Sequence, residues 1–248
     1  MINLSDRLQR IADNINKGET MADIGTDHGF LPIYLIQKGV SPKVIMSDVS
    51  KPSLMKAKQN SDIYIGEAQE NIDFRVGDGL SVLKAAEVDV VVIAGMGGKL
   101  IRDILSEDIT LTCSFKKFIF QPRIGQGALR RWLLENGFII IREELVTEGR
   151  HIPEIITALA PGAGGGLRHD RINKDFGDEG NEMFYKIPPW IVKAAGPVEE
   201  FLTRNIEAEK KKLENVMLSK NRNQELESKI CEDIYYLKGL LKEYRNGR

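Results

Sequence analysis

Residues 21–38 constrain the fold of this chain more than any other stretch. Residues 21–24 (MADI) form a short apolar run with one acid, which is typical of a parallel strand buried on both faces. Gly25 and Gly29 follow, and glycine lets the backbone turn sharply and approach a ligand closely. Pro32 then lies in the first turn of a helix, where its missing N–H is harmless. The stretch therefore predicts the first strand, turn and helix of a nucleotide-binding α/β domain.

The charge of this turn indicates which nucleotide it suits. Asp23 and Asp27 flank Gly25 in the pattern D-x-G-x-D-x-G, whereas the dinucleotide pattern G-x-G-x-x-G places a pyrophosphate there and avoids acids. A carboxylate near a unit positive charge is worth about 1–4 kcal/mol at surface-like dielectric. The turn therefore favours S-adenosylmethionine, which carries an ammonium and a sulfonium, over a dinucleotide. The alternative is an ordinary strand–turn–helix corner with incidental acids.

The composition is that of a globular protein with one full core and a smaller appendage. The chain has 248 residues, of which 42% are hydrophobic and 29% charged. No apolar run reaches membrane-spanning length, and charges at positions 6, 7 and 10 interrupt any signal peptide. Cys113 and Cys231 lie far apart without metal-ligand spacing, so we expect a cytoplasmic protein without membrane or metal partners. The net charge of −1 means that any surface for nucleic acid is local.

Further apolar runs predict strands over residues 43–48, 72–76, 88–94 and 118–121. The first of these ends at Asp48, where Rossmann-like units bind ribose hydroxyls; the alternative is an N-cap for the next helix, which Asp48 or Ser50 could equally provide. Asp78 lies in a G-D-G turn directly after the run over 72–76. It either accepts a hydrogen bond from an adenine amine or simply forms the turn. The run over 88–94 continues into GMGG at 95–98, whose missing side chains open a cleft at the carboxyl edge of the sheet.

The remainder of the chain predicts an antiparallel hairpin and then a helical domain. Runs over 138–146 and 152–159, joined by E-G-R at 148–150, complete the sheet of a Rossmann-like methyltransferase, whereas dehydrogenases continue with parallel units. Residues 161–180 are glycine-rich and predict a mobile linker or loop. Apolar stripes over 202–216 and 226–244, with a polar break at 219–223, predict a coiled-coil-like helical hairpin. Basic residues near its tip either lie on a solvated face or grip a polyanion. We therefore predict a methyltransferase domain over 1–160 and a linker with a helical domain over 161–248.

Four motifs carry a family resemblance: DIGTDHGFLP, GDGL, IAGMGG and QPR occur in this order, and L-S-x-R-L lies near the N-terminus. Together they resemble the bacterial tRNA (adenine-N1)-methyltransferases that modify adenine 22, which combine a Rossmann-like catalytic domain with C-terminal coiled-coil helices. Two departures stand out: Arg123 replaces the asparagine of the family's Q-P-N, and the linker differs from the usual junction. GMGG also stands where enzymes that methylate amino groups have N-P-P-Y, which is consistent with a ring nitrogen as target.

The resemblance implies a tRNA partner, S-adenosylmethionine as cofactor, S-adenosylhomocysteine as its product, and a set of site residues. Asp27 would be the acid at the reacting centre, near the cation that forms on the methylated ring. The predicted cofactor-binding residues are Arg7, Asp23, Gly25, Thr26, His28, Gly29, Asp48, Val49, Gly77, Asp78, Gly79, Ala94, Gly95 and Met96. Basic residues would hold RNA phosphates, and those that we predict are Lys99, Lys116, Lys117, Arg123, Arg130 and Arg131.

Two other functions stay open at this point, and we expect a monomer in each case. An NAD-dependent oxidoreductase would need a phosphate-tolerant turn and a catalytic His or Tyr, and the three histidines, at 28, 151 and 169, lack that context. A non-catalytic RNA-binding scaffold with a degenerate cofactor fold would bind tRNA without transferring a methyl group.

Overall fold

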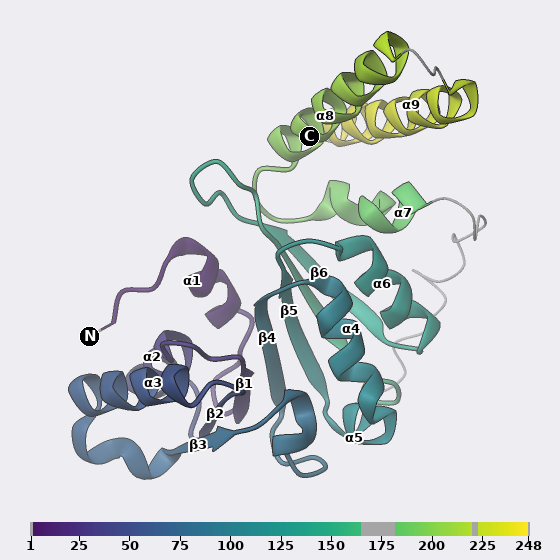
Figure 1. Ribbon diagram of the computed structural model, residues 1–248. Helices are drawn as coiled ribbons and strands as arrows, with labels where there is room; N and C mark the ends of the chain where they lie inside the picture. Colours follow the sequence, from purple (N-terminus) through teal and green to yellow (C-terminus); the bar gives the residue numbers. More distant parts are fainter. Residues whose placement is uncertain (1, 165–181, 220–222, 248) are drawn as a thin grey trace.

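The computed structural model describes residues 2–164, 182–219 and 223–247, which contain one seven-stranded sheet with helices on both faces (Figure 1). The strand order is β3-β2-β1-β4-β5-β7-β6. Strands β1 to β5 are parallel, β7 is antiparallel to β5, and β6 is antiparallel to β7. The strands are β1 (Met21–Ile24), β2 (Val44–Asp48), β3 (Ile72–Val76), β4 (Val90–Met96), β5 (Lys117–Pro122), β6 (Ile139–Leu145) and β7 (Glu154–Leu159).

The central strands are apolar throughout because helices cover both faces of the sheet. Val90 and Val92 of β4 pack into the core beneath α1, α2 and α3, whereas Val91 and Ile93 pack into the core beneath α4, α5 and α6. These helices are α1 (Asp6–Ala12), α2 (Phe30–Gln37), α3 (Lys51–Tyr64), α4 (Gly98–Glu107), α5 (Ile109–Ser114) and α6 (Gln126–Glu135). Two 3₁₀ turns flank β3 in the chain: η1 (Gly66–Asn71) precedes it and η2 (Gly79–Val82) follows it.

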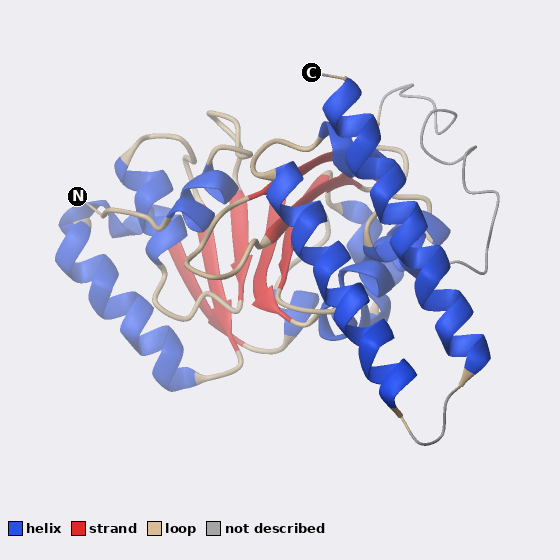
Figure 2. Cartoon of the chain, turned by 90° about the horizontal axis from the view of Figure 1, so that it is seen from above, coloured by secondary structure: helices blue, strands red, loops and turns tan. Residues whose placement is uncertain are grey.

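The C-terminal helices pack against the end of the sheet through a third core. They are α7 (Glu182–Lys186), the 3₁₀ turn η4 (Pro189–Lys193), α8 (Val198–Leu218) and α9 (Gln224–Asn246). Figure 2 shows α8 and α9 as a long antiparallel hairpin. Leu145 of β6 belongs to this third core, and its N–H donates to the carbonyl of Ala195 at 2.8 Å. A Cβ on the next residue, Gly196, would lie 1.9 Å from the carbonyl oxygen of Leu145, so the contact requires glycine.

The predicted architecture is confirmed: a mostly parallel Rossmann-like sheet ends in an antiparallel hairpin and is followed by paired helices. Strand β4 begins later than predicted, at Val90. It also ends later, because Met96 still pairs with Pro122. The short helices α5 and α7 were not predicted. The predicted linker lies outside the described residues from 165 onward, and the boundary at 160/161 stays a prediction. Among the described residues, no helix is long and apolar enough to cross a membrane.

Candidate functional site

The turn between β1 and α2 places its backbone close to the end of β2. Gly25, Asp27 and Gly29 have φ values of +77°, +48° and +71°, in the left-handed region where a side chain is strained. The N–H groups of Gly25 and Thr26 both donate to the carbonyl of Ser47, at 2.8 and 2.9 Å. This geometry explains why positions 25 and 29 are glycine. Asp27 has a side chain although its φ is also left-handed, and the surrounding contacts hold it in this conformation.

Asp48 is fixed by two backbone donors at the carboxyl end of β2. Its Oδ1 accepts from the N–H of Ser50 at 2.8 Å, and its Oδ2 accepts from the N–H of Asp27 at 3.3 Å. The N-cap of α3 is Ser50, whose hydroxyl accepts from the N–H of Ser53 at 3.3 Å. The alternative that Asp48 caps this helix is therefore wrong, and its carboxylate keeps lone pairs for a ligand.

Asp23 is a buried carboxyl at the same edge, with 7% of its surface exposed. Burial raises its pKa from 3.8 to about 6; the hydroxyl of Thr26, which donates to it at 2.8 Å, opposes this, Asp48 adds to it, and Arg7 opposes it. A buried carboxyl that resists ionisation favours a cationic neighbour. This environment fits a group that contacts a positively charged ligand.

Asp23 is expected to cost stability at neutral pH when no ligand is bound. Folding raises the pKa of Asp23, so the folded protein holds this proton more tightly than the unfolded chain does. The resulting contribution to the free energy of unfolding is fully present below pH 3.8 and is lost as the pH rises through about 6. Asp23→Asn, which keeps the acceptor for Thr26, should raise the free energy of unfolding at pH 7.5 by on the order of 2–3 kcal/mol. Urea unfolding at pH 7.5 and pH 4 checks this: the gain should shrink at pH 4, and an equal gain at both values would contradict the assignment.

Asp27 and His28 form an exposed pair beside this turn. The Oδ2 of Asp27 lies 2.8 Å from the Nδ1 of His28, and their side chains are 59% and 47% exposed. The His28 ring stacks on Phe30, with ring centroids 5.5 Å apart and an interplanar angle of 22°. Asn60 of α3 donates to the carbonyl of His28 at 2.9 Å, which fixes the backbone beneath the pair. The carboxylate of Asp27 is thus both accessible and oriented.

The glycine loop after β4 is tied to the loop after β5. The N–H of Arg123 donates to the carbonyl of Met96, and that of Gly98 to Ile124, each at 2.7 Å. A Cβ on Gly98 would lie 2.2 Å from the carbonyl oxygen of Gly125, so this close approach excludes any larger residue. Gly95, at φ +77°, faces open space on its exposed side. Here the missing side chains leave room above the carboxyl edge.

Arg7 reaches this edge from α1 and contacts two residues that sequence reasoning missed. Its Nη1 donates to Oε1 of the buried Gln121 at 3.0 Å, and its Nε lies 3.2 Å from Oε2 of Glu148. Gln121 opens the QPR motif, which was the one available signal; Glu148 offered none, because its contact with Arg7 spans 141 positions. The expectation that Arg7 comes near the cofactor strand is supported, since its charge acts on Asp23.

The other predicted cofactor residues lie at the same edge. Val49, 65% exposed, follows β2 directly, and the exposed Asp78 precedes η2 between two glycines. A Cβ on Gly77 would lie 2.4 Å from a methyl of Val82, and Gly79 has φ +51°. Ala94 and Met96 end β4, and Met96 reaches the space beside Gly25. The structure therefore gathers the residues after β1, β2, β3 and β4 along one edge, where open parallel sheets bind ligands.

Comparison with known proteins identifies the family. A methyltransferase domain family matches residues 4–156. The chain belongs to this methyltransferase family. A tRNA (adenine(22)-N(1))-methyltransferase of Bacillus subtilis is 34% identical over 159 residues, which cover 64% of this chain and 66% of that protein. The alignments span less than two thirds of the curated relatives that the chain matches.

Solved structures match over nearly the whole chain. The B. subtilis m1A22 tRNA methyltransferase TrmK superposes with a TM-score of 0.79 and 25% identity, covering 97% of this chain and 100% of that one. The Streptococcus pneumoniae protein Sp1610 in complex with S-adenosyl-L-methionine gives a TM-score of 0.77 and 25% identity, covering 96% and 100%. These matches include the C-terminal helices as well as the methyltransferase domain.

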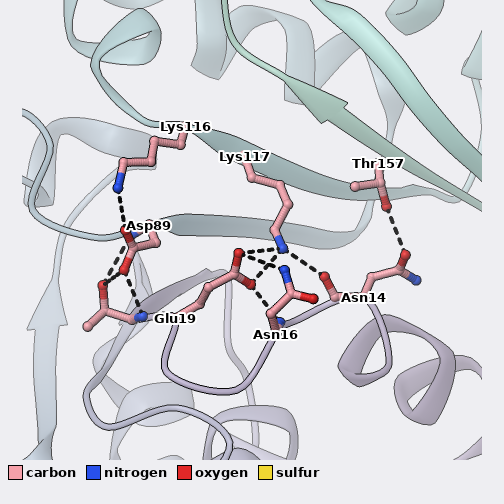
Figure 3. Close-up of polar contacts among 8 residues, drawn as sticks. Asn14, Asn16, Glu19, Asp89, Lys116, Lys117 and Thr157 are labelled. Atoms are coloured by element: carbon pink, nitrogen blue, oxygen red, sulfur yellow. Dashed lines mark hydrogen bonds and ion pairs between the residues drawn. The ribbon is translucent and has the colours of Figure 1, made fainter. Parts of the chain in front are cut away.

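The six basic residues predicted to hold RNA do not form one surface in this methyltransferase. Lys99, in the first turn of α4, and Arg123, in the loop after β5, are both exposed at the carboxyl edge. Figure 3 shows Lys116 and Lys117 at the start of β5, the opposite end of the strands. Lys117 is buried and bound to Glu19 at 2.6 Å, so its predicted phosphate contact is wrong. Lys116 is exposed and bound to Asp89 at 2.9 Å, away from the predicted cofactor edge.

Arg130 is also wrong as an RNA contact, because its side chain is fully buried. Its Nε and Nη2 donate to Glu143 at 2.8 and 2.9 Å, and Nη2 also contacts Glu154. Burial opposes its charge, but the two carboxylates outweigh burial and raise the pKa of Arg130. Arg131 lies over the ring of Tyr185 at 4.5 Å. These neighbouring arginines could not be told apart from the local pattern, since both belong to the same helix, α6.

A cavity of about 1010 Å³ lies between α6, α7 and the α8–α9 hairpin. Lys186 and Lys212 on its wall both bind the buried Glu209, at 2.8 and 2.7 Å. Its lining, in the described part of the chain, includes none of the predicted cofactor residues. No group of three or more metal-ligating side chains occurs among the described residues.

Proposed function

We propose that this protein transfers a methyl group from S-adenosylmethionine to N1 of adenine 22 in bacterial tRNA. The observation that carries the proposal is the acidic edge of the sheet: Asp23, Asp27 and Asp48 meet there on a fold that matches the B. subtilis tRNA methyltransferase over nearly its whole length. The NAD-dependent alternative would require a pyrophosphate beside these carboxylates, and the family match does not favour it.

The donor set at this edge fits S-adenosylmethionine. Asp48, held by two backbone N–H groups, would accept hydrogen bonds from the ribose hydroxyls, and Asp78 would accept one from the adenine amine. Asp23 and Arg7 would set the charge around the methionine end. Gly25, Gly29 and Gly95 would let the backbone approach, and the remaining predicted residues (Thr26, Val49, Gly77, Gly79, Ala94 and Met96) would line the walls.

The residues of this site would act mainly by alignment and by charge. When bound, S-adenosylmethionine supplies an electrophilic methyl group and leaves as S-adenosylhomocysteine. N1 of adenine already carries an in-plane lone pair, so no strong base is needed and positioning supplies several kcal/mol. Asp27 would stabilise the positive charge that develops on the ring more than the neutral ground state. Because N1 is engaged in folded tRNA, the base must be exposed or flipped into the site.

Lys99 and Arg123 would hold the RNA backbone near this edge, with Arg131 further along α6. Phosphate contacts of this kind give salt-dependent affinity without sequence specificity. We further propose that the enzyme acts as a monomer in the cytoplasm. Light scattering of the free protein tests whether it is a monomer.

One assay tests the proposed reaction. The protein is incubated with an unmodified tRNA transcript and S-adenosylmethionine, and the nucleosides are identified by mass spectrometry. The expected product is 1-methyladenosine, absent when the transcript carries guanine at position 22. Binding of tRNA without any methylated nucleoside would favour the non-catalytic scaffold, whereas uptake of NADH but not of S-adenosylmethionine would favour the oxidoreductase.

Asp48→Ala is expected to weaken S-adenosylmethionine binding by about 1.5–3 kcal/mol, which is roughly 10- to 150-fold in Kd, because charge-assisted hydrogen bonds are lost. Calorimetric titration measures this directly. Ser50→Ala is the matched control: it removes the cap of α3, costs about 1 kcal/mol of stability, and should leave Kd within twofold. An unchanged Kd for Asp48→Ala would remove this residue from the ribose site.

A further inference from the structure

The aromatic pair of His28 and Phe30 stands out at the edge where the proposed reaction takes place. The residue Phe30 is 37% exposed and the His28 side chain 47%, and their rings stack at 5.5 Å. Phe30 is the first residue of α2, directly after the turn that carries Asp27. Burial would be the usual arrangement for such rings, so an exposed stack beside a candidate catalytic carboxylate calls for a ligand with a flat face.

Two contacts hold His28 beside Asp27. His28 is held on one side by Asp27 at 2.8 Å and through its carbonyl by Asn60 at 2.9 Å. The backbone of Phe30 is fixed as the first residue of α2. Other large apolar side chains are exposed after neighbouring strands, Val49 at 65% and Ile124 at 72%. An exposed pair of stacked rings suits an unstacked nucleobase, since bases stack on Phe and His side chains.

We propose that His28 and Phe30 form the surface on which the adenine to be methylated stacks while Asp27 faces its ring edge. This inference rests on the proposed function and names the residues that would receive the flipped base. It assigns the His28 side chain to the RNA substrate, whereas sequence reasoning placed His28 among the cofactor residues. An aromatic face also favours the cationic ring that methylation produces, because a cation over an aromatic ring is attracted to it.

The test separates RNA binding from cofactor binding. Phe30→Leu keeps an apolar side chain but removes the ring, and His28→Asn keeps a polar partner for Asp27 but removes the other ring. Each is expected to raise KM for tRNA by about tenfold or more, while Kd for S-adenosylmethionine stays within twofold of the wild type. Phe30→Tyr, which retains the ring, should stay near the wild-type KM.

Tyr64→Leu is the matched control. Tyr64 ends α3 and is 40% exposed, close to the value for Phe30, but it lies near the amino ends of the strands. Its KM for tRNA should not change. A tRNA with 2-aminopurine at position 22 adds a readout that fold defects would not mimic: stacking on the wild type should quench its fluorescence, and Phe30→Leu should relieve the quenching.

The outcomes distinguish this inference from the proposed function. If the wild type methylates adenine 22 but both variants keep a normal KM and normal quenching, the stacking surface is refuted and the function stands. If Kd for S-adenosylmethionine rises in parallel with KM, the rings belong to the cofactor site, and the inference is again overturned. If the wild type transfers no methyl group to tRNA, the proposed function fails and this inference fails with it.

Discussion

Replacing Asp27 with alanine is expected to lower the turnover of methyl transfer to tRNA by about 100-fold or more, with little change in the affinity for S-adenosylmethionine. The carboxylate is exposed and lies 2.8 Å from Nδ1 of His28, so in the proposed site it would be accessible to the ring that becomes positively charged. Loss of one such electrostatic group typically costs a factor of this size in kcat. Single-turnover kinetics with saturating cofactor measures the effect on the chemical step.

The backbone of Asp27 makes the choice of variants important. At φ +48° an alanine is strained, whereas asparagine tolerates this region and glycine is free of strain. Asp27→Asn keeps a hydrogen-bond acceptor for His28 and removes the charge, and Asp27→Gly removes the side chain without the strain. If charge is the cause, all three variants should lose turnover to a similar extent while their melting temperatures differ.

Two results would exclude this role. Near-normal turnover in Asp27→Asn would show that the charge is not used in the chemical step. A loss of cofactor affinity that accounts for the whole fall in activity would place Asp27 in the cofactor site. Calorimetry on the same three variants separates these possibilities from the expected result.

The sheet was predictable from the sequence because its strands are buried on both faces. The apolar run at 72–76 matches β3 at both ends, and that at 43–48 matches β2 to within one residue. The edge proposed for the site was predictable as well, since Asp48 ends β2 and Gly97 directly follows β4. In these cases the local pattern and the tertiary environment point to the same structure.

Contacts between distant segments could not be predicted from local patterns. Lys117 opens a strand whose residues are all buried, yet its amine reaches Glu19 and the carbonyl of Asn14, which are about one hundred positions away. Arg7 is likewise placed by Gln121 and Glu148. A charged residue next to an apolar run reads as exposed unless its partner is known, and that partner is set by the packed fold.

Arg130 is the clearest such case, and its replacement by methionine is expected to destabilise the protein by about 3–5 kcal/mol at pH 7.5. The guanidinium neutralises the buried Glu143 and Glu154, and its Nη1 donates to the carbonyls of Tyr185 and Lys186 at 3.1 and 3.0 Å. Without it, two buried carboxylates lie close together with no cation between them, and α7 loses two hydrogen bonds to α6. Urea unfolding measures the loss.

The size of this loss should depend on the two carboxylates rather than on the volume of the side chain. Burial raises the pKa of Glu154, and the charge and hydrogen bond of Arg130 oppose this rise. The triple variant Arg130→Met, Glu143→Gln, Glu154→Gln should therefore recover much of the lost stability, because replacing a whole buried charge cluster is often neutral. Arg142→Met, at an exposed position next to Glu143, is the control and should change stability by about 0.5 kcal/mol or less. A single Arg130→Met variant as stable as this control would show that the cluster does not hold α7 to the sheet, and the docking of the C-terminal helices would then rest on their apolar core and on contacts such as the hydrogen bond from Leu145 to Ala195.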